Sequence, residues 1–316
     1  VKTNEASVMN AIDPSVMADP VTGKWWMHYG SFFGGLYCVE LDPETGLPAE
    51  EGDQGHLTAR RANYQKDNLE APEIIYNPDL KQYYLFVSYD PLMTTYNVRV
   101  GRSDKAEGPF VDFSGVELKD TTNNFPILTA PYRFHNHPGW AGTAHCSVFT
   151  SDEGQYFMAH QGRLSPHNQM MDLHLRQVFF TPDGWPVVSP ERYTGSVSRK
   201  FSAEDMAGEW EVIRIQEPAY ERRLQAGQIL WGEGQLKEEE WNVSHLLSLE
   251  KNGHLGENKG NWEFLEAKQL LSLTLEGEII NNLIIFAGHD WENEKETVLF
   301  TGLDSRGRSI WGKRIK

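Results

Sequence analysis

The sequence predicts an all-β protein in which a β-propeller is followed by a small β-barrel or sandwich. Short runs rich in Val, Ile, Tyr, Phe and Trp, broken by Asp, Asn, Pro and Gly, dominate the 316 residues, and apolar residues rarely recur at helical spacing. A hairpin pattern recurs in the first two thirds of the chain and stops before residue 204. We therefore divide the chain into a propeller domain, residues 1–203, and a second domain, residues 204–316.

The repeated unit is a hairpin that begins with an ionisable residue. It reads DPSVMADPVTGKWWMHYGSF from Asp13, EAPEIIYNPDLKQYYLFVSYD from Glu70 and HCSVFTSDEGQYFMAHQG from His145. Small antiparallel sheets repeated around an axis form a propeller, whose innermost strands all begin near one end of that axis. We therefore expect Asp13, Glu70 and His145 to converge on one pocket. The alternative is that they are solvated or capping residues at strand starts.

The region after residue 204 lacks this leading residue. Segments such as NWEFLEAKQLLSLTLEGEIINNLIIFAGHD and ETVLFTGLDSRGRSIWGKRI indicate strands joined by Gly, Asn and Asp turns. Its length is sufficient for a separate small β-domain.

Composition excludes several classes of partner. The formal net charge is -16 and the pI is near 5.1, which argues against binding to nucleic acid or to an anionic membrane surface. No run of about 18 apolar residues predicts a membrane-spanning helix. The two cysteines, Cys38 and Cys146, are too few for a disulfide framework, and their pairing stays open. The ten tryptophans suit sugar stacking as well as core packing.

Two carboxylates and a histidine in one pocket suit glycoside hydrolysis. One carboxylic acid protonates the departing oxygen, and a second carboxylate acts on water or on the sugar. A negative charge on Asp13 would favour the protonated form of Glu70, as a general acid requires. Regular strand alternation places Glu73 on the face opposite Glu70, which excludes it as the acid. A metal site built from Asp, Glu and His ligands is the other chemical interpretation.

Several segments together resemble a known family. NAIDPSV, YGSFFGGLYCVELDPETGLP, EAPEIIY with YYLFVSYD, RVGRSDKAEGPFVD, GWAGTAHCSVF and RQVFFTPDGWPVVSPERYTG follow one another from about residue 9 to about residue 200. In this order they resemble family 43 glycoside hydrolases, and within that family the two-domain endo-1,5-α-L-arabinanases. The resemblance implies a five-bladed propeller with an ancillary β-domain, and inverting, endo-acting hydrolysis of α-1,5-L-arabinofuranosidic linkages in plant cell-wall arabinan.

The resemblance also implies roles for individual residues. Glu70 matches the general acid, and Asp13 matches the aspartate that adjusts the pKa of the acid and orients the sugar. His145 matches the histidine at the channel centre, beside a calcium or similar ion, sodium among them, that is bound through water. The residues that match sugar-lining segments are Asn10, Ser31 and Phe32.

This sequence departs from the family pattern at two places. Ala144 and Cys146 flank His145 where the family usually has Gly and Asn, which leaves the identity of the ion open. The catalytic base of the family is an aspartate upstream of NAIDP, whereas Glu5 is the sole acid before Asp13. We therefore expect the base to lie outside this chain, with an N-terminal fragment completing the propeller.

The expected partners are arabinan and arabino-oligosaccharides, met outside the cell or in the periplasm because the substrate is a polymer. Two alternatives stay open: a non-catalytic carbohydrate-binding propeller, suggested by the missing base, and a family 43 xylosidase or arabinofuranosidase, which would share the same acidic motifs.

Overall fold

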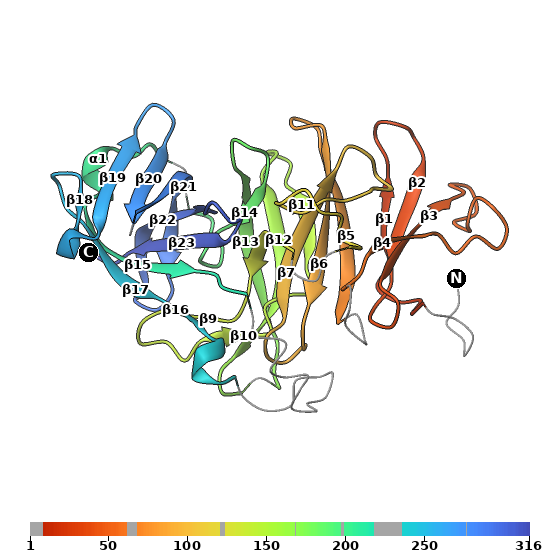
Figure 1. Cartoon of the computed structure of the whole chain (residues 1–316), viewed down its shortest axis with the longest axis horizontal. Helices are drawn as coiled ribbons and strands as arrows, with labels where there is room; N and C mark the ends of the chain where they lie inside the picture. The colour runs from red at the N-terminus through yellow and green to blue at the C-terminus, as the bar shows by residue number, and fades with distance from the viewer. Residues whose placement is uncertain are drawn as a thin grey trace.

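The computed structural model describes residues 9–61, 68–120, 124–167, 169–196, 199–217, 236–275 and 277–316. Within these ranges the secondary structure is almost entirely β (Figure 1), and the helical elements are short: α1 (Ala203–Met206), η1 (Glu238–Glu240) and η2 (Gly256–Asn258). The predicted all-β class is confirmed. None of the helices in the described part is long and apolar enough to cross a membrane.

In the described residues, the first part of the chain forms two four-stranded antiparallel sheets and a third sheet of seven strands, four of which follow one another in sequence order as in the first two. The first sheet contains β1 (Ser15–Ala18), β2 (Trp25–Tyr29), β3 (Leu36–Leu41) and β4 (His56–Ala59). The second contains β5 (Leu69–Asn77), β6 (Gln82–Tyr89), β7 (Asn97–Ser103) and β8 (Ile127–Thr129). The third contains β11 (Ser147–Thr150), β12 (Tyr156–Leu164), β13 (Asp172–Phe180) and β14 (Pro186–Val188).

The three sheets stand side by side as propeller blades do (Figure 1), with β5 next to both β1 and β11. Residues of β6 alternate between the two interfaces, as expected for a strand that is buried on both faces. Tyr83 and Leu85 pack in the core shared with the first sheet, whereas Tyr84 and Phe86 pack in the core shared with the third. The described residues hold three such sheets, and the number of five blades stays a prediction.

The second part of the chain is a barrel rather than a sandwich. Its strands are β15 (Gly208–Arg214), β17 (His245–Leu249), β18 (His254–Leu255), β19 (Gly260–Leu265), β20 (Leu270–Leu275), β21 (Glu278–Asp290), β22 (Lys295–Leu303) and β23 (Ser309–Arg314), which close on themselves. Apolar side chains such as Trp210, Leu271 and Phe300 form its core. Eight strands enclose a space that side chains can fill.

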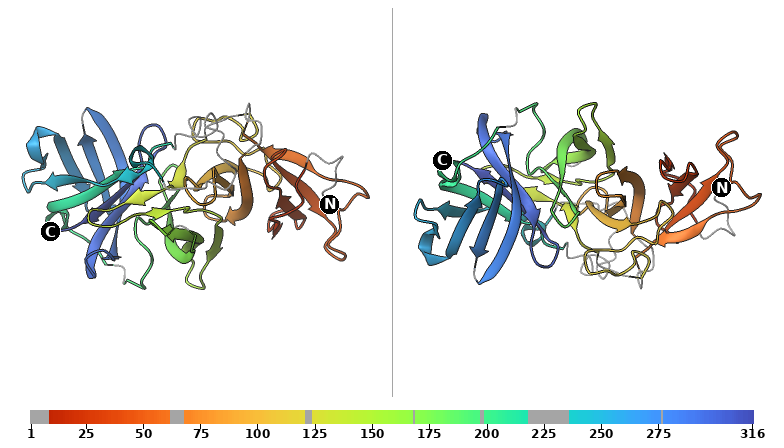
Figure 2. Two further views of the ribbon diagram at one scale, coloured as in Figure 1. Left: turned by 90° about the horizontal axis from the view of Figure 1, so that it is seen from below. Right: turned by 90° about the horizontal axis from the view of Figure 1, so that it is seen from above.

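The barrel lies against the third sheet (Figure 2), with β22 in contact with β14. Strands β9 (Tyr132–Arg133) and β10 (Trp140–Ala141) extend that sheet, and β16 (Asn242–Val243) joins β9 in parallel. Trp311 of the barrel belongs to the same apolar cluster as Tyr132. The two parts therefore share an apolar cluster where they meet, in addition to the core inside the barrel, and a boundary at residue 203 stays a prediction.

Candidate active site

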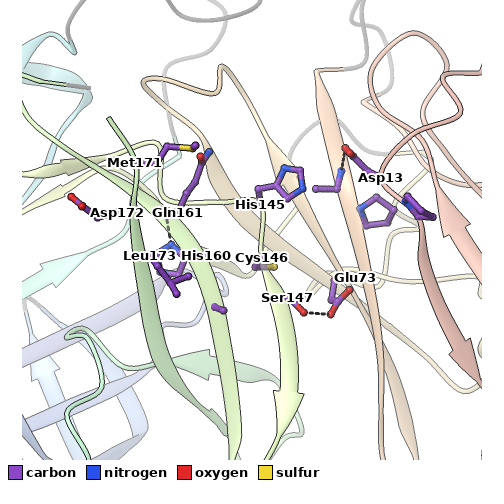
Figure 3. Close-up of a pocket in the computed structure, with 14 residues that line it drawn as sticks. Asp13, Glu73, His145, Cys146, Ser147, His160, Gln161, Met171, Asp172 and Leu173 are labelled. Atoms are coloured by element: carbon purple, nitrogen blue, oxygen red, sulfur yellow. Dashed lines mark hydrogen bonds between the residues drawn. The ribbon is translucent and has the colours of Figure 1, made fainter. Parts of the chain in front are cut away.

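A pocket of about 490 Å³ opens where the three innermost strands begin. It is lined by residues 13–14, 71–73, 145–147, 159–161 and 171–173. In Figure 3 the labelled side chains of Asp13, Glu73 and His145 surround this space, although they come from three different sheets. The structure thus brings together segments that are far apart in the sequence.

A residue in the left-handed region lies just before β1 and β11, and near the start of β5. The φ angles are 53° at Asp13, 50° at Ala71 and 54° at His145. The left-handed region disfavours residues other than Gly, and such strain clusters at functional sites. Two positions after each of these residues comes a residue that pairs with the second strand of its hairpin. The three pairs are Ser15↔His28, Glu73↔Phe86 and Ser147↔Ala159. Ala71 is therefore the structural equivalent of Asp13 and His145.

Glu70 lies one position earlier than the repeat predicts, because β5 contains a bulge. The register changes from Glu70↔Ser88 to Glu73↔Phe86, so two residues of β5, Ala71 and Pro72, oppose one residue of β6, Val87. The extra residue puts Glu70 and Glu73 on the same face, and the prediction of opposite faces is wrong. Pro72 inside the strand was the available signal, since proline in a strand often marks a bulge.

The carboxylate of Glu70 is held by two hydroxyl groups. Tyr96 donates to Oε1 at 2.5 Å, and Ser31 donates to Oε2 at 2.9 Å. Tyr96 is fully buried, and burial, followed by the negative charge of Glu70, raises its pKa well above the usual value. Its phenol therefore stays protonated and able to donate. No sequence pattern indicated Tyr96.

Asp13 and His145 lie beside Glu70. Oδ2 of Asp13 accepts the backbone N–H of Ala71 at 3.3 Å, directly after Glu70. The backbone N–H of His145 donates to Oγ of Ser88 at 2.8 Å, and Ser88 pairs with Glu70 across the sheet. Asp13 and His145 therefore line the pocket, and Glu70 lies beside them but is not among the residues that line it in the described part of the chain. Their chemical roles stay predictions.

The three residues predicted to bind sugar, Asn10, Ser31 and Phe32, lie outside the lining of the pocket in the described part of the chain. Ser31 contacts Glu70, and Phe32 donates its backbone N–H to the carbonyl of Leu69 at 2.8 Å, so both lie at the start of β5. Asn10 accepts the backbone N–H of Ile12 at 3.0 Å through its carbonyl. A role in binding sugar stays a prediction for each.

Comparison with known domains covers both parts of the chain. Residues 1–186 match the domain of glycosyl hydrolases family 43, and residues 190–312 match a C-terminal lipocalin-like domain named after the same family. The chain belongs to glycoside hydrolase family 43.

Individual family 43 relatives match nearly all of this chain. The extracellular endo-α-(1→5)-L-arabinanase of Thermotoga petrophila is 30% identical over 97% of the chain, and extracellular endo-α-(1→5)-L-arabinanase 2 of Bacillus subtilis is 27% identical over 96%. The chain spans 64% of the length of each. A crystal structure of the Thermotoga petrophila enzyme matches with a TM-score of 0.82 and 27% identity, over 99% of this chain and 69% of that one. These likenesses confirm a propeller-type domain followed by a barrel.

A metal ion near His145 stays a prediction. The imidazole of His145 is exposed in the pocket and has no hydrogen-bond partner within the described ranges, which fits contact with a hydrated ion. The described group whose ligand atoms lie close enough to bind an ion directly is elsewhere, formed by Glu191, Asp290 and Glu292. Lys313 Nζ lies 2.9 Å from carboxylate oxygens of both Glu191 and Asp290 and also bonds Glu292, so an ammonium already fills that place.

The surroundings of His160 and Cys146 make these two side chains unsuited to a catalytic role. Nε2 of His160 accepts from Nε of Arg176 at 3.0 Å, and Nδ1 bonds the carbonyl of Gln161 at 2.7 Å. Burial, followed by the charge of Arg176, lowers the pKa of His160 to about 3, so the ring stays neutral with both nitrogens engaged. Cys146 is buried and unpaired, as is Cys38, which answers the open question about a disulfide.

Proposed function

We propose that this chain belongs to an enzyme that hydrolyses α-1,5-L-arabinofuranosidic linkages in plant cell-wall arabinan, endo-acting and with inversion. The observation that carries the proposal is the position of Glu70: its carboxylate is oriented by Ser31 and Tyr96 beside Asp13, in a family 43 chain. The names of the relatives, endo-arabinanases over 96% and 97% of this chain, support the substrate. A solved α-L-arabinanase in complex with arabinohexaose has a TM-score of 0.51 to this chain, at 28% identity over 60% of each chain.

In the proposed reaction Glu70 is the general acid. Its carboxyl proton passes to the glycosidic oxygen as the bond to the anomeric carbon breaks. The hydroxyls of Ser31 and Tyr96 fix the plane of the carboxyl group. Asp13 places a second carboxylate next to Glu70 and orients the sugar. Inversion needs a base about 6.5–9.5 Å from the acid, which we assign to sequence outside this chain.

We also propose one calcium or similar ion, sodium among them, bound through water near His145. Its positive charge would stabilise negative charge that develops near the centre of the channel. Among the described residues, Asp13 lines the same pocket and would face the hydrated ion with His145.

An N-terminal fragment that completes the propeller is part of the proposal. The outer face of the first sheet exposes Val16 (48%) and Trp25 (37%), and that of the third exposes Phe149 (46%) and Leu173 (80%). Register places each pair on the face turned away from the second sheet. Exposed apolar sheet faces are typical of interfaces, and two further blades would cover both. The names of the relatives support an extracellular location; a periplasmic one agrees equally with a polymeric substrate.

The test is the substitution Glu70→Gln in the full-length gene product. Loss of the acid should lower kcat on linear arabinan by about 10²- to 10⁴-fold. Glu153→Gln, in the exposed turn between β11 and β12, is the matched control and should retain wild-type activity. A loss of only a few-fold for Glu70→Gln would contradict the assignment.

The two alternatives predict different outcomes of the same assays. Binding of arabino-oligosaccharides in calorimetry without release of sugar would indicate a non-catalytic propeller. Products from xylan, or single arabinose units from branched arabinan, would indicate a xylosidase or an arabinofuranosidase.

A further inference from the structure

Glu73 links the three innermost strands of the propeller. One carboxylate oxygen, Oε2, accepts from Oγ of Ser15 in β1 at 2.8 Å. The other, Oε1, accepts from Oγ of Ser147 at 2.8 Å and from the backbone N–H of Val148 at 3.0 Å, both in β11. Figure 3 shows the bond to Ser147 as a dashed line. Glu73 thus joins the second sheet to both of its neighbours.

The serine on the first sheet is bound twice by β5. Besides donating to Glu73, Oγ of Ser15 accepts the backbone N–H of Ile74 at 3.2 Å. Ser15 is 9% exposed, so these bonds form where water competes little. The hydroxyl therefore fixes the separation of β1 and β5 at this level.

This layer lies directly behind the proposed catalytic residues. Ser15, Glu73 and Ser147 each follow the left-handed residues Asp13, Ala71 and His145 by two positions, and two strand residues rise about 6.6 Å. At the level of the site itself, separate bonds join the second sheet to its neighbours: Ala71 to Asp13 at 3.3 Å and Ser31 to Glu70 at 2.9 Å on one side, and His145 to Ser88 at 2.8 Å on the other. In the layer behind, the single carboxylate of Glu73 bonds both neighbouring sheets, so it couples their spacing.

The partners of Glu73 are all uncharged. Two hydroxyls and a backbone N–H bind its carboxylate, and no ion pair joins it to a cation in the described part of the chain. A glutamine in its place retains a carbonyl oxygen for Ser147 and Val148, and its amide N–H is able to donate to Ser15. The substitution Glu73→Gln therefore removes the negative charge of this side chain while keeping its shape and its capacity for hydrogen bonds.

We infer that Glu73 is a positioning residue for the reaction proposed above, which holds Asp13, Glu70 and His145 at their working separation through hydrogen bonds. The inference depends on the proposed function. Displacement of a reacting group by about 1 Å costs on the order of 10² in rate. A displaced Glu70 would fail specifically as an acid, so the loss should depend on how much the leaving group needs a proton.

The experiment compares two substrates on the full-length gene product. Linear arabino-oligosaccharides have a poor leaving group, whereas a 4-nitrophenyl arabino-oligosaccharide has one that departs without protonation. For Glu73→Ala we expect kcat on the first substrate to fall by about 10- to 100-fold, with KM changed less than about 3-fold, and kcat on the second to fall by less than about 3-fold. Equal losses on both substrates in protein that melts like wild type would overturn the inference.

Three further variants sharpen the test. Glu73→Gln should stay within about 3-fold of wild type on both substrates, and a loss equal to that of Glu73→Ala would show that charge, not position, matters. Ser147→Ala removes only the hydrogen bond from Ser147 to Glu73. Its kcat should fall less than that of Glu73→Ala, and again more on the arabino-oligosaccharide than on the 4-nitrophenyl substrate. This variant tests the inference even if Glu73→Ala fails to fold. Glu70→Gln separates the two proposals. If Glu70→Gln is active, the proposed function is wrong. If Glu70→Gln is inactive but Glu73→Ala is fully active, only the positioning role of Glu73 is wrong.

Discussion

The hydroxyl of Tyr96, a fully buried residue in the loop between β6 and β7, lies 2.5 Å from Oε1 of the partly buried Glu70. Ser31, which pairs with Glu70 across an isolated bridge, holds the other oxygen. The carboxyl group therefore has a fixed orientation before any sugar enters the pocket. Fixed orientation of the acid is the structural basis of the proposed reaction.

The substitution Tyr96→Phe removes one of these two bonds and keeps the ring. We expect kcat on linear arabinan to fall by about 10-fold, because Glu70 becomes free to rotate while still able to donate. Tyr156→Phe, which removes a hydroxyl from a half-buried ring of β12, is the control and should retain full activity. A change of less than twofold for Tyr96→Phe would show that Ser31 alone orients the acid.

His28 should make the stability of the protein fall in acid. Its ring is fully buried between the first two sheets, where Nε2 bonds the carbonyl of Ala106 at 2.9 Å, and burial lowers its pKa to about 4. Between that value and about 6.5 the unfolded chain binds a proton that the folded chain does not. Stability is therefore fully present above pH 6.5 and is lost as the pH falls towards 4, by about 3 kcal/mol in total.

The measurement is the free energy of unfolding between pH 4 and pH 7.5. His28→Gln should have a flatter dependence on pH than wild type, whereas His254→Gln, at an exposed position of the barrel, should match it. Parallel curves for His28→Gln and wild type would refute the role of His28.

Lys313 should be essential where the barrel meets the third sheet. Its fully buried ammonium bonds Glu191, Asp290 and Glu292 and lies 3.9 Å from the centre of the Phe134 ring. Lys313→Met leaves the carboxylates uncompensated and should lower the free energy of unfolding by about 3–5 kcal/mol. Denaturant titration measures this, with the exposed Lys251→Met as control. A loss below about 1 kcal/mol would mean that the acidic side chains are protonated and need no cation.

The repeated hairpins were predictable because their signal is local. Alternating apolar residues and turn residues define β1–β2, β5–β6 and β11–β12, and all three are present. Closure of the barrel and the parallel pairing of β16 with β9 depend on contacts more than a hundred residues apart, as between Asn242 and Tyr132. No local pattern encodes such contacts, which explains why barrel and sandwich were indistinguishable.

The repeat predicts the positions of Asp13 and His145 at the pocket, but it does not predict the register of Glu70. A strand of strict period two cannot place Glu70 and Glu73 on one face, and the bulge that does so depends on the left-handed Ala71 before Pro72. Tyr96 reaches Glu70 from a loop that follows β6, where a tyrosine has no distinctive pattern. The sequence pattern therefore does not predict the orientation of Glu70, because this orientation depends on the backbone conformation at Ala71 and on the distant Tyr96.

The most direct test is a crystal structure of the full-length Glu70→Gln protein with a bound linear arabino-oligosaccharide. We expect a glycosidic oxygen of the bound oligosaccharide within about 2.6–3.2 Å of the amide of residue 70, above the pocket lined by Asp13 and His145. An oligosaccharide bound with every glycosidic oxygen beyond reach of that amide, or bound on another face, would contradict it.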